Sequence, residues 1–171
     1  MLRQQITERL EQTFSEHGFA EPGVAQLKEA CEVSLRTLYK HYPSKEAMVI
    51  GALEARHQRY LARLADCAAE TSAEMAQRLF EQLGLWMRDC APNGCLSMNA
   101  LTAFPDSEAI RTVVDTHKSE LRAALVQLTG NNNQSDPLFL LHEGVCASWP
   151  LMGDAAVDAA KSTAMMLFKE V

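Results

Sequence analysis

The sequence contains no apolar run close to the roughly 20 residues that a membrane-spanning helix requires. Its first stretch, MLRQQITERL, alternates polar and apolar residues and lacks the continuous apolar core of a signal peptide. We therefore expect a cytoplasmic protein with no membrane partner. With 171 residues the chain is long enough to bury a core without help from a disulfide or a metal.

Metal, thiol and catalytic motifs are missing as well. The five cysteines are scattered, form no CxxC pair and show no zinc-ligand spacing with the five histidines. We expect no metal site, disulfide framework or cofactor, and interpret most cysteines as small buried hydrophobic residues. The C-terminal two-thirds shows no Ser-His-Asp order, glycine-rich phosphate loop or paired carboxylates, so we expect no enzyme.

Acidic residues predominate, giving a net charge of −6, but they are unevenly distributed. Residues 1–60 hold eight basic and eight acidic side chains, whereas residues 61–171 hold eight and fourteen. The segment 33–45 contains Arg36, Lys40 and Lys45 and no acid. This distribution indicates a short anion-facing patch on a body that otherwise repels anions.

Apolar residues recur at helical spacing along nearly the whole chain, and no strand-like alternation competes with them. The pattern predicts an all-α fold of about nine helices. An N-terminal three-helix helix-turn-helix domain is joined by a long helix to a C-terminal helical bundle, with the boundary between residues 1–48 and 49–171.

Caps and breaks predict where the helices begin and end. Ser34 and Ser44 are expected to cap the third and fourth helices, and proline at 137 suits the first turn of a later one. In the N-terminal part we expect helices over 2–17, over about two turns after Gly23, over 35–41 and from 45 to about 69. A fifth helix carries an apolar stripe from Met75 to Cys90, and a sixth runs from Cys95 to about Ala103. The last three are a long helix introduced by Pro105 and Asp106, a helix over Asp136–Met152 and a helix over Asp154–Val171.

A short helix over 35–41 is suited to reading DNA. In a helix-turn-helix the second helix enters the major groove, and its first residues meet base edges. Leu38 is predicted to face inward, while Leu35, Arg36, Thr37, Lys40 and His41 can project. The hydroxyls of Tyr39 and Tyr42 could reach phosphates, or both rings could pack against the fourth helix. Lys45 lies at a helix start, where backbone N–H groups and the helix dipole favour phosphate.

Three short runs in this segment resemble a known sequence pattern: Val33-Ser34, Thr37-Leu38-Tyr39-Lys40-His41-Tyr42 and Ser44-Lys45-Glu46-Ala47. Residues 2–50 resemble the DNA-binding domain of the TetR family of transcriptional repressors. The resemblance implies a homodimer that binds a double-stranded DNA operator through residues 1–48, with ligand binding and dimerisation in 49–171. It implies phosphate contacts from Tyr39, His41 and Lys45, and places Leu35, Arg36, Thr37 and Lys40 nearest the bases; Ser34 and Tyr42 complete the expected DNA-binding set.

Two positions depart from the family's pattern. Lys28 and Glu32 stand where the family usually has alanine and glycine. Glycine there allows a positive φ angle without steric cost, so glutamate should cost about 1 kcal/mol. It would also place a negative charge near the DNA.

A repressor that is released by a signal needs a pocket, usually an apolar one with a few polar groups. We expect a small-molecule effector, of unknown identity, to bind around the break at 91–94. Plain core packing is the alternative for each candidate. The candidate ligand-binding residues are Trp86, Met87, Cys90, Cys95, Met98, Asn99, Phe104, His117 and Trp149.

Dimerisation is expected through the last two helices, which are apolar on more than one side. Two half-sites one DNA turn apart require two recognition (reading) helices, one from each subunit, held by one rigid interface. Two other classes of function stay open. One is a thiol-based redox protein using Cys90 and Cys95, with Cys95 in the first turn of a helix, where the dipole favours thiolate. The other is a helical interaction module without DNA binding.

Overall fold

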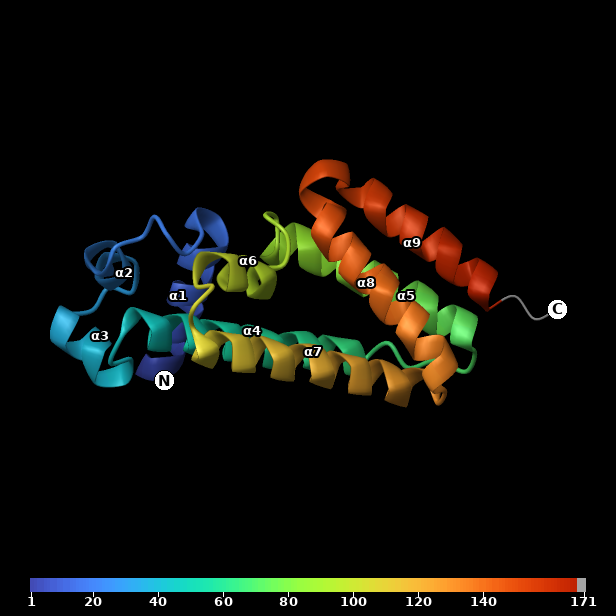
Figure 1. Ribbon diagram of the computed structural model, residues 1–171, viewed down its shortest axis with the longest axis horizontal. Helices are drawn as coiled ribbons and strands as arrows, with labels where there is room; N and C mark the ends of the chain where they lie inside the picture. The colour runs from blue at the N-terminus through green and yellow to red at the C-terminus, as the bar shows by residue number, and fades with distance from the viewer. Residues whose placement is uncertain (169–171) are drawn as a thin grey trace. The chain divides into compact units, whose positions relative to one another are not determined.

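The computed structural model describes residues 1–168, except for the side chain of Asn132, and over this range it contains nine α-helices and no strand (Figure 1). The predicted all-α fold is confirmed. No helix within the described range is both long and apolar enough to cross a membrane. The helices are α1 (Leu2–His17), α2 (Val24–Ala30), α3 (Leu35–His41), α4 (Lys45–Ala65), α5 (Ser72–Cys90), α6 (Leu96–Ala103), α7 (Glu108–Thr129), α8 (Asn132–Met152) and α9 (Asp154–Leu167).

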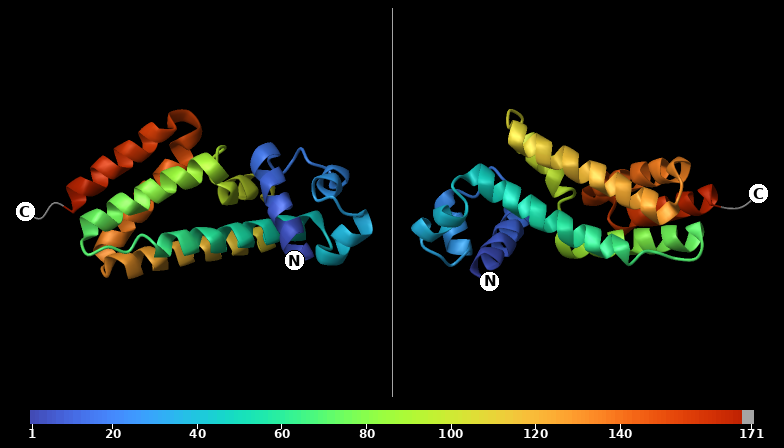
Figure 2. Two further views of the ribbon diagram at one scale, coloured as in Figure 1. Left: turned by 180° about the vertical axis from the view of Figure 1, so that it is seen from behind. Right: turned by 90° about the horizontal axis from the view of Figure 1, so that it is seen from below.

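Residue contacts divide the chain into two compact units. Unit 1 comprises Met1–Gln58 and Cys95–Thr116, and unit 2 comprises Arg59–Gly94 and His117–Val171. Helices α4 and α7 are continuous in both views of Figure 2 and contribute residues to both units. These units are defined by packing, so the functional boundary near residue 48 stays a prediction.

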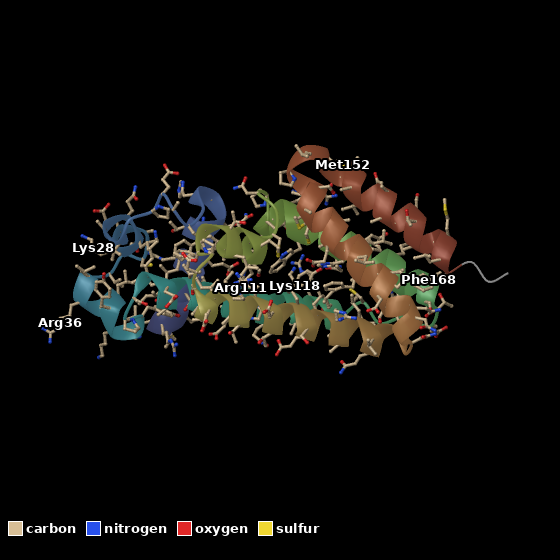
Figure 3. The ribbon with its side chains drawn as sticks, viewed as in Figure 1. Lys28, Arg36, Arg111, Lys118, Met152 and Phe168 are labelled. Carbon is tan, nitrogen blue, oxygen red and sulfur yellow. The ribbon has the colours of Figure 1, made fainter. Side chains whose placement is uncertain are left out.

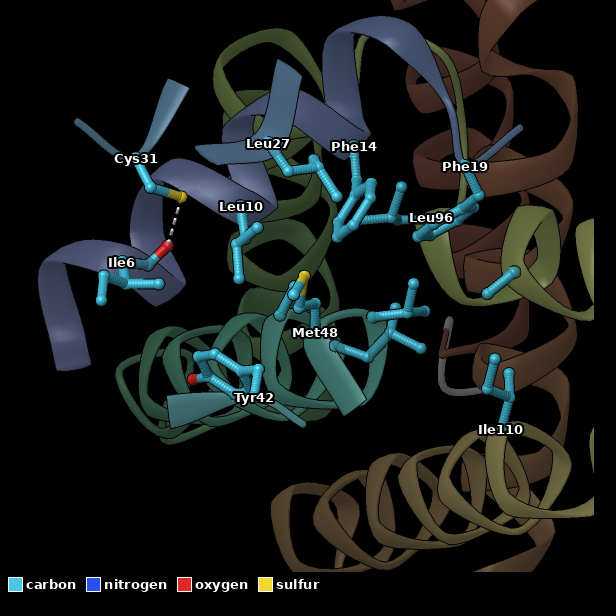
Figure 4. Packing of buried hydrophobic residues seen from close by; sticks show 14 of the residues in the cluster. Ile6, Leu10, Phe14, Phe19, Leu27, Cys31, Tyr42, Met48, Leu96 and Ile110 are labelled. Carbon is cyan, nitrogen blue, oxygen red and sulfur yellow. Dashed lines mark hydrogen bonds between the residues drawn. The ribbon is translucent and has the colours of Figure 1, made fainter. Parts of the chain in front are cut away.

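The core of unit 1 is built from α1, α2, α3 and the start of α4, together with α6 and the start of α7 (Figure 4). Leu10 and Phe14 of α1 are fully buried, as are Leu27 of α2 and Leu38 of α3. Burying a side chain of this size contributes about 1.5–3 kcal/mol relative to exposing it. The helix-turn-helix is therefore held by the core of unit 1, to which α6 and α7 also contribute.

A buried ion pair joins α1 to α4 inside unit 1. Arg56 Nη1 lies 2.9 Å from Glu11 Oε1, and the two side chains are only 8% and 6% exposed. Two charges are tolerated at such depth because each compensates the other. The pair therefore links α4 to α1 inside unit 1.

The starts of α3 and α4 agree with the predictions, because the two predicted serine caps are formed. The Oγ atoms of Ser34 and Ser44 accept the backbone N–H groups of Thr37 and Ala47, at 3.1 and 3.0 Å. At α7 it is Ser107 that caps, since its Oγ accepts the Ile110 N–H at 3.1 Å. This helix begins at Glu108, just after the Pro105 and Asp106 that were predicted to introduce it.

Helix α8 begins at Asn132, four residues before the predicted Asp136. The side chain of Asn131 accepts the Asn133 N–H at 2.9 Å and caps the helix, which places Pro137 and Pro150 inside it. Two other ends differ from prediction: α4 stops at Ala65 rather than near Ala69, and α9 stops at Leu167. The predicted continuation over 169–171 lies outside the described residues.

Unit 2 is assembled from the later part of α4, α5, the later part of α7, α8 and α9. Helix α5 buries one continuous face, from Met75 to Met87, as its predicted stripe requires. The ring of Tyr60 packs on that of Trp86 with centroids 5.0 Å apart. At Gly94, with φ +86°, an added Cβ would lie 3.2 Å from the carbonyl oxygen of Cys146, so a side chain there would be strained and would require its neighbours to shift.

Candidate DNA-binding site

The turn between α2 and α3 closes as a Schellman motif. Glu32 N–H bonds to the Glu29 carbonyl at 3.0 Å, and Val33 N–H bonds to the Lys28 carbonyl at 3.3 Å. The residue at the left-handed position of this motif is usually glycine. Here it is Glu32, with φ +53°, which confirms the backbone conformation expected from the departure at this position.

The charge of Glu32 is partly offset by a neighbour. Arg9 Nη1 on α1 lies 2.8 Å from Glu32 Oε2, and the same nitrogen donates to the Ala30 carbonyl at 3.3 Å. The two side chains are 39% and 75% exposed, so solvent screens the attraction. Arg9 thus ties α1 to the turn and reduces the negative charge beside α3.

Helix α3 separates an inward from an outward face. Leu38 is fully buried, while Arg36 and Lys40, one helical turn apart, are both exposed. Figure 3 shows Arg36 extending away from the ribbon at the end of unit 1 that carries α3. Ser34 and Leu35 are exposed, Tyr39 is 40% exposed, and Thr37 and His41 are half-buried. The exposed face therefore combines two cations with groups that can contact DNA.

Tyr42 differs from the other predicted DNA contacts. Its side chain is only 4% exposed, and its hydroxyl is hydrogen-bonded to the hydroxyl of Thr7 on α1. Its ring also lies against Gly51 of α4, where an added Cβ would approach Cε1 within 2.4 Å. The expectation that this hydroxyl reaches phosphate is corrected: Tyr42 packs between α1 and α4, because the extended backbone at the end of α3 turns the ring inward.

The start of α4 presents a second cationic position. Lys45 is the first helical residue and is half-buried, and this burial lowers the pKa of its ammonium. The adjacent Glu46 carboxylate is held by the Ser107 hydroxyl, which donates to its Oε1. The helix start therefore offers backbone N–H groups beside a lysine, with its one nearby acid already bound.

The candidate ligand-binding residues divide between the two units. Trp86, Met87, Cys90, His117 and Trp149 belong to unit 2, and Cys95, Met98, Asn99 and Phe104 belong to unit 1. All of the unit 2 members except the half-buried Cys90 are buried. In unit 1, Met98 and Asn99 are exposed, and Phe104 packs edge-on against Phe19 with centroids 6.0 Å apart. Core packing, the alternative left open, accounts for Phe104.

Cys95 does not lie in the first turn of α6. It is the N-cap residue, and its side chain makes no capping hydrogen bond, because the helix begins one residue later than expected. Cys90 and Cys95 are half-buried, whereas Cys31, Cys67 and Cys146 are buried. Burial raises the pKa of the Cys31 and Cys67 thiols to about 11, which keeps both protonated.

A buried polar cluster in unit 2 was not predicted. The hydroxyl of Tyr60 on α4 is hydrogen-bonded to Nε2 of His142 on α8, and Glu143 accepts from Lys118 of α7 at 2.6 Å. Burial lowers the pKa of His142, so its ring is neutral at pH 7. Burial alone would raise the pKa of Glu143, but the His142 hydrogen bond and the Lys118 charge outweigh it and hold the pKa at about 2. Because Tyr60 and His142 are 82 residues apart, no local pattern could have found the pair.

Comparison with known proteins agrees with this geometry. Residues 6–52 match the family described as "Bacterial regulatory proteins, tetR family". No curated protein matches the chain. Among solved structures, a TetR-family transcriptional regulator from Streptomyces coelicolor aligns with a TM-score of 0.82 at 16% identity, over 99% of this chain and 96% of that one.

Two other solved structures share the fold. The reduced form of NemR from E. coli aligns with a TM-score of 0.80 at 20% identity, over 96% of this chain and 95% of that one. The multidrug binding protein EbrR complexed with imidazole aligns with a TM-score of 0.71 at 18% identity, over 100% of this chain and 97% of that one. At these identities the likeness shows the fold, and the family match covers the helix-turn-helix. The helix-turn-helix of this chain therefore matches the tetR family of bacterial regulatory proteins over residues 6–52, and the whole chain shares the fold of solved TetR-family structures.

Proposed function

We propose that this protein is a transcriptional repressor that binds a palindromic operator as a homodimer and is released by a small apolar ligand or by cysteine modification. The observation that carries the proposal is the division of α3 into a buried Leu38 and an exposed Arg36–Lys40 face, on a helix that follows a closed helix-turn-helix turn. A helix so placed can enter the major groove with its first residues toward the bases. Its function is binding rather than catalysis.

The roles divide according to position. Leu35, Arg36, Thr37 and Lys40 would meet base edges, because they lie on the outward face of the reading helix. Tyr39, His41 and Lys45 would contact phosphates, which fix the register of a protein on the duplex without specifying sequence. Glu32 beside them weakens the attraction, and its pairing with Arg9 limits that effect.

A homodimer through α8 and α9 is supported by apolar side chains exposed on these helices. Leu151 is 90% exposed, and Leu140 and Met166 are each 70% exposed. On the small-residue face of α9, Ala155 and Ala159 are also exposed. An isologous interface made from two copies of this helix pair would bury these side chains and set the spacing of the two reading helices. Light scattering that gives a monomer at micromolar concentration would refute this part of the proposal.

The effector is proposed to be a small molecule bound by unit 2. EbrR, which shares the fold, is a multidrug binding protein whose structures include complexes with imidazole and with proflavin. In the present chain, unit 2 buries Trp86 beneath Arg59 and Arg63, whose guanidinium carbons lie 5.8 and 5.5 Å from the ring centroid. An aromatic wall with nearby polar groups suits a flat apolar ligand. The half-buried Cys90 and Cys95 are the positions for the alternative, covalent signal.

A direct test is fluorescence anisotropy with DNA taken from upstream of the protein's own coding region. Arg36→Ala should weaken specific binding by about 1–3 kcal/mol and relax selectivity at one base pair. Lys45→Ala should weaken binding to all sequences alike and reduce the salt slope by about one. Arg111→Ala, which removes an exposed cation on α7, is the matched control and should change neither quantity. Equal effects of all three substitutions would contradict the assignment of α3 as the reading helix.

A further inference from the structure

Helix α8 brings three different metal-binding side chains together inside unit 2. His142, Glu143 and Cys146 each offer one ligand atom, and these atoms all lie within 4.8 Å of one another. His142 Nδ1 is 3.2 Å from Glu143 Oε1 and 3.9 Å from Cys146 Sγ. His142 and Cys146 face the same way because they are four residues apart on a helix. No spacing rule for zinc sites includes this arrangement, so the sequence predicted no metal site.

The two separations from His142 Nδ1 are close to those of ligand atoms around a tetrahedral ion. Zinc bonds of about 2.0–2.3 Å to nitrogen, oxygen and sulfur place the ligand atoms roughly 3.3–3.8 Å apart. The distances from His142 Nδ1 to Glu143 Oε1 and to Cys146 Sγ lie close to this range. A further soft donor, the Met87 thioether of α5, lies 4.0 Å from Cys146 Sγ. The three ligands could therefore close around one ion with small side-chain shifts.

The surrounding groups match the outer contacts that metal ligands need. The Tyr60 hydroxyl is bonded to His142 Nε2, which fixes the ring and leaves Nδ1 directed at Glu143 and Cys146. Lys118 Nζ holds Glu143 through Oε2, whereas Oε1 is the atom near His142. His142 is 3% exposed and Cys146 is 7% exposed, whereas the Glu143 side chain is 24% exposed, so the site is buried on the His142 and Cys146 side and reaches solvent at Glu143.

We propose that His142, Glu143 and Cys146 bind a divalent thiophilic cation of the zinc class. One thiolate, one imidazole and one carboxylate form a borderline-soft donor set, which suits Zn²⁺ rather than Mg²⁺ or Ca²⁺. On binding, the imidazole proton occupies Nε2 and is donated to the Tyr60 oxygen. The Cys146 thiol loses its proton to solvent, so one proton is released for each ion bound.

The test is titration of the metal-free full-length protein with Zn²⁺, and with Co²⁺ as its spectroscopic substitute. We expect one ion per chain, a thiolate-to-cobalt charge-transfer band, and about one proton released, measured by calorimetry in buffers of different ionisation enthalpy. Cys146→Ser should abolish the band and weaken Zn²⁺ binding by at least about 100-fold. Tyr60→Phe, which removes only the outer hydrogen bond, should weaken it by about 10–100-fold.

Cys67→Ser is the matched control, because Cys67 is, like Cys146, a buried cysteine of unit 2 but lies outside the cluster. It should leave both the band and the affinity unchanged. Circular dichroism of each metal-free variant separates a lost ligand from a lost fold, and Glu143→Gln supplies a second ligand change if Cys146→Ser unfolds the chain. The proposal is overturned if the wild type shows no thiolate band, or if Cys67→Ser and Cys146→Ser have equal effects.

Discussion

Replacing Glu32 tests whether a strained residue closes the helix-turn-helix. Glu32 has φ +53°, a conformation in which a Cβ costs roughly 1–2 kcal/mol. Glutamate gains from Arg9 in return, but an ion pair with side chains 39% and 75% exposed contributes only about 0.2–1 kcal/mol. Three variants, Glu32→Gly, Glu32→Ala and Glu32→Gln, separate the strain from the charge.

Glycine relieves the strain but loses about 0.4–1 kcal/mol through the greater freedom of the unfolded chain. Alanine keeps the strain and loses the ion pair. We therefore expect the glycine variant to exceed the alanine variant in free energy of unfolding by about 1 kcal/mol, and to lie within about 1 kcal/mol of the wild type. For a chain of this length the difference between glycine and alanine corresponds to roughly 2–4 °C in Tm.

Urea denaturation followed by circular dichroism measures these differences. Glu32→Gln keeps the Cβ and removes only the charge, so it should lose no more than the ion pair contributes. Arg9→Ala should produce a similar small loss. If the alanine variant is as stable as the glycine variant, the turn does not hold this residue in a left-handed conformation, and the strain argument fails.

Three further predictions concern the interior. Gly51→Ala should lower the free energy of unfolding by about 1–3 kcal/mol, measured by urea denaturation, because overpacking against a buried ring outweighs the roughly 1 kcal/mol gain in helix propensity. Arg56→Met should cost about 3–5 kcal/mol in the same assay, because it removes the cation that compensates the buried Glu11 carboxylate. Adding Glu11→Leu should restore most of the loss, and equal instability of the single and double variants would contradict this. Iodoacetamide at pH 8 should label the two half-buried cysteines and spare Cys31 and Cys67, whose thiols stay protonated, as peptide mass spectrometry can check.

Local signals were sufficient for most of the helix-turn-helix. The caps at Ser34 and Ser44 depend on side chains within three residues of the N–H groups they accept, so sequence alone predicts them. The predicted start of α8 was wrong because the sequence offers two possible starts, one at Asp136 before Pro137 and one at Asn132 after the Asn131 cap. Pro137 favours a start at Asp136. In the structure the helix starts earlier, and Ser135 and Leu138 in its first turns are buried by other parts of the chain. Contacts of that kind cannot be predicted from local sequence.

The interior of unit 2 could not be predicted in the same way. Tyr60 and His142 meet across 82 residues, and Cys146 meets Met87 across 59. Helical spacing shows which residues share a face, but it does not say which face of another helix they meet. The likeness to the TetR family adds little here, since the family match ends at residue 52.

The side chain of Tyr42 connects three helices of unit 1, and its contact with Gly51 is the tightest part of this connection. The ring follows α3, bonds to Thr7 of α1 and occupies the space where α4 would carry a Cβ. Positions 42 and 51 are therefore expected to covary among homologues: a smaller residue at 42 would accommodate alanine at 51, and tyrosine at 42 would require glycine. An exchange of that kind would also alter the angle between α3 and the core. The orientation of α3 on DNA could thus change during evolution without a change in any residue that contacts DNA.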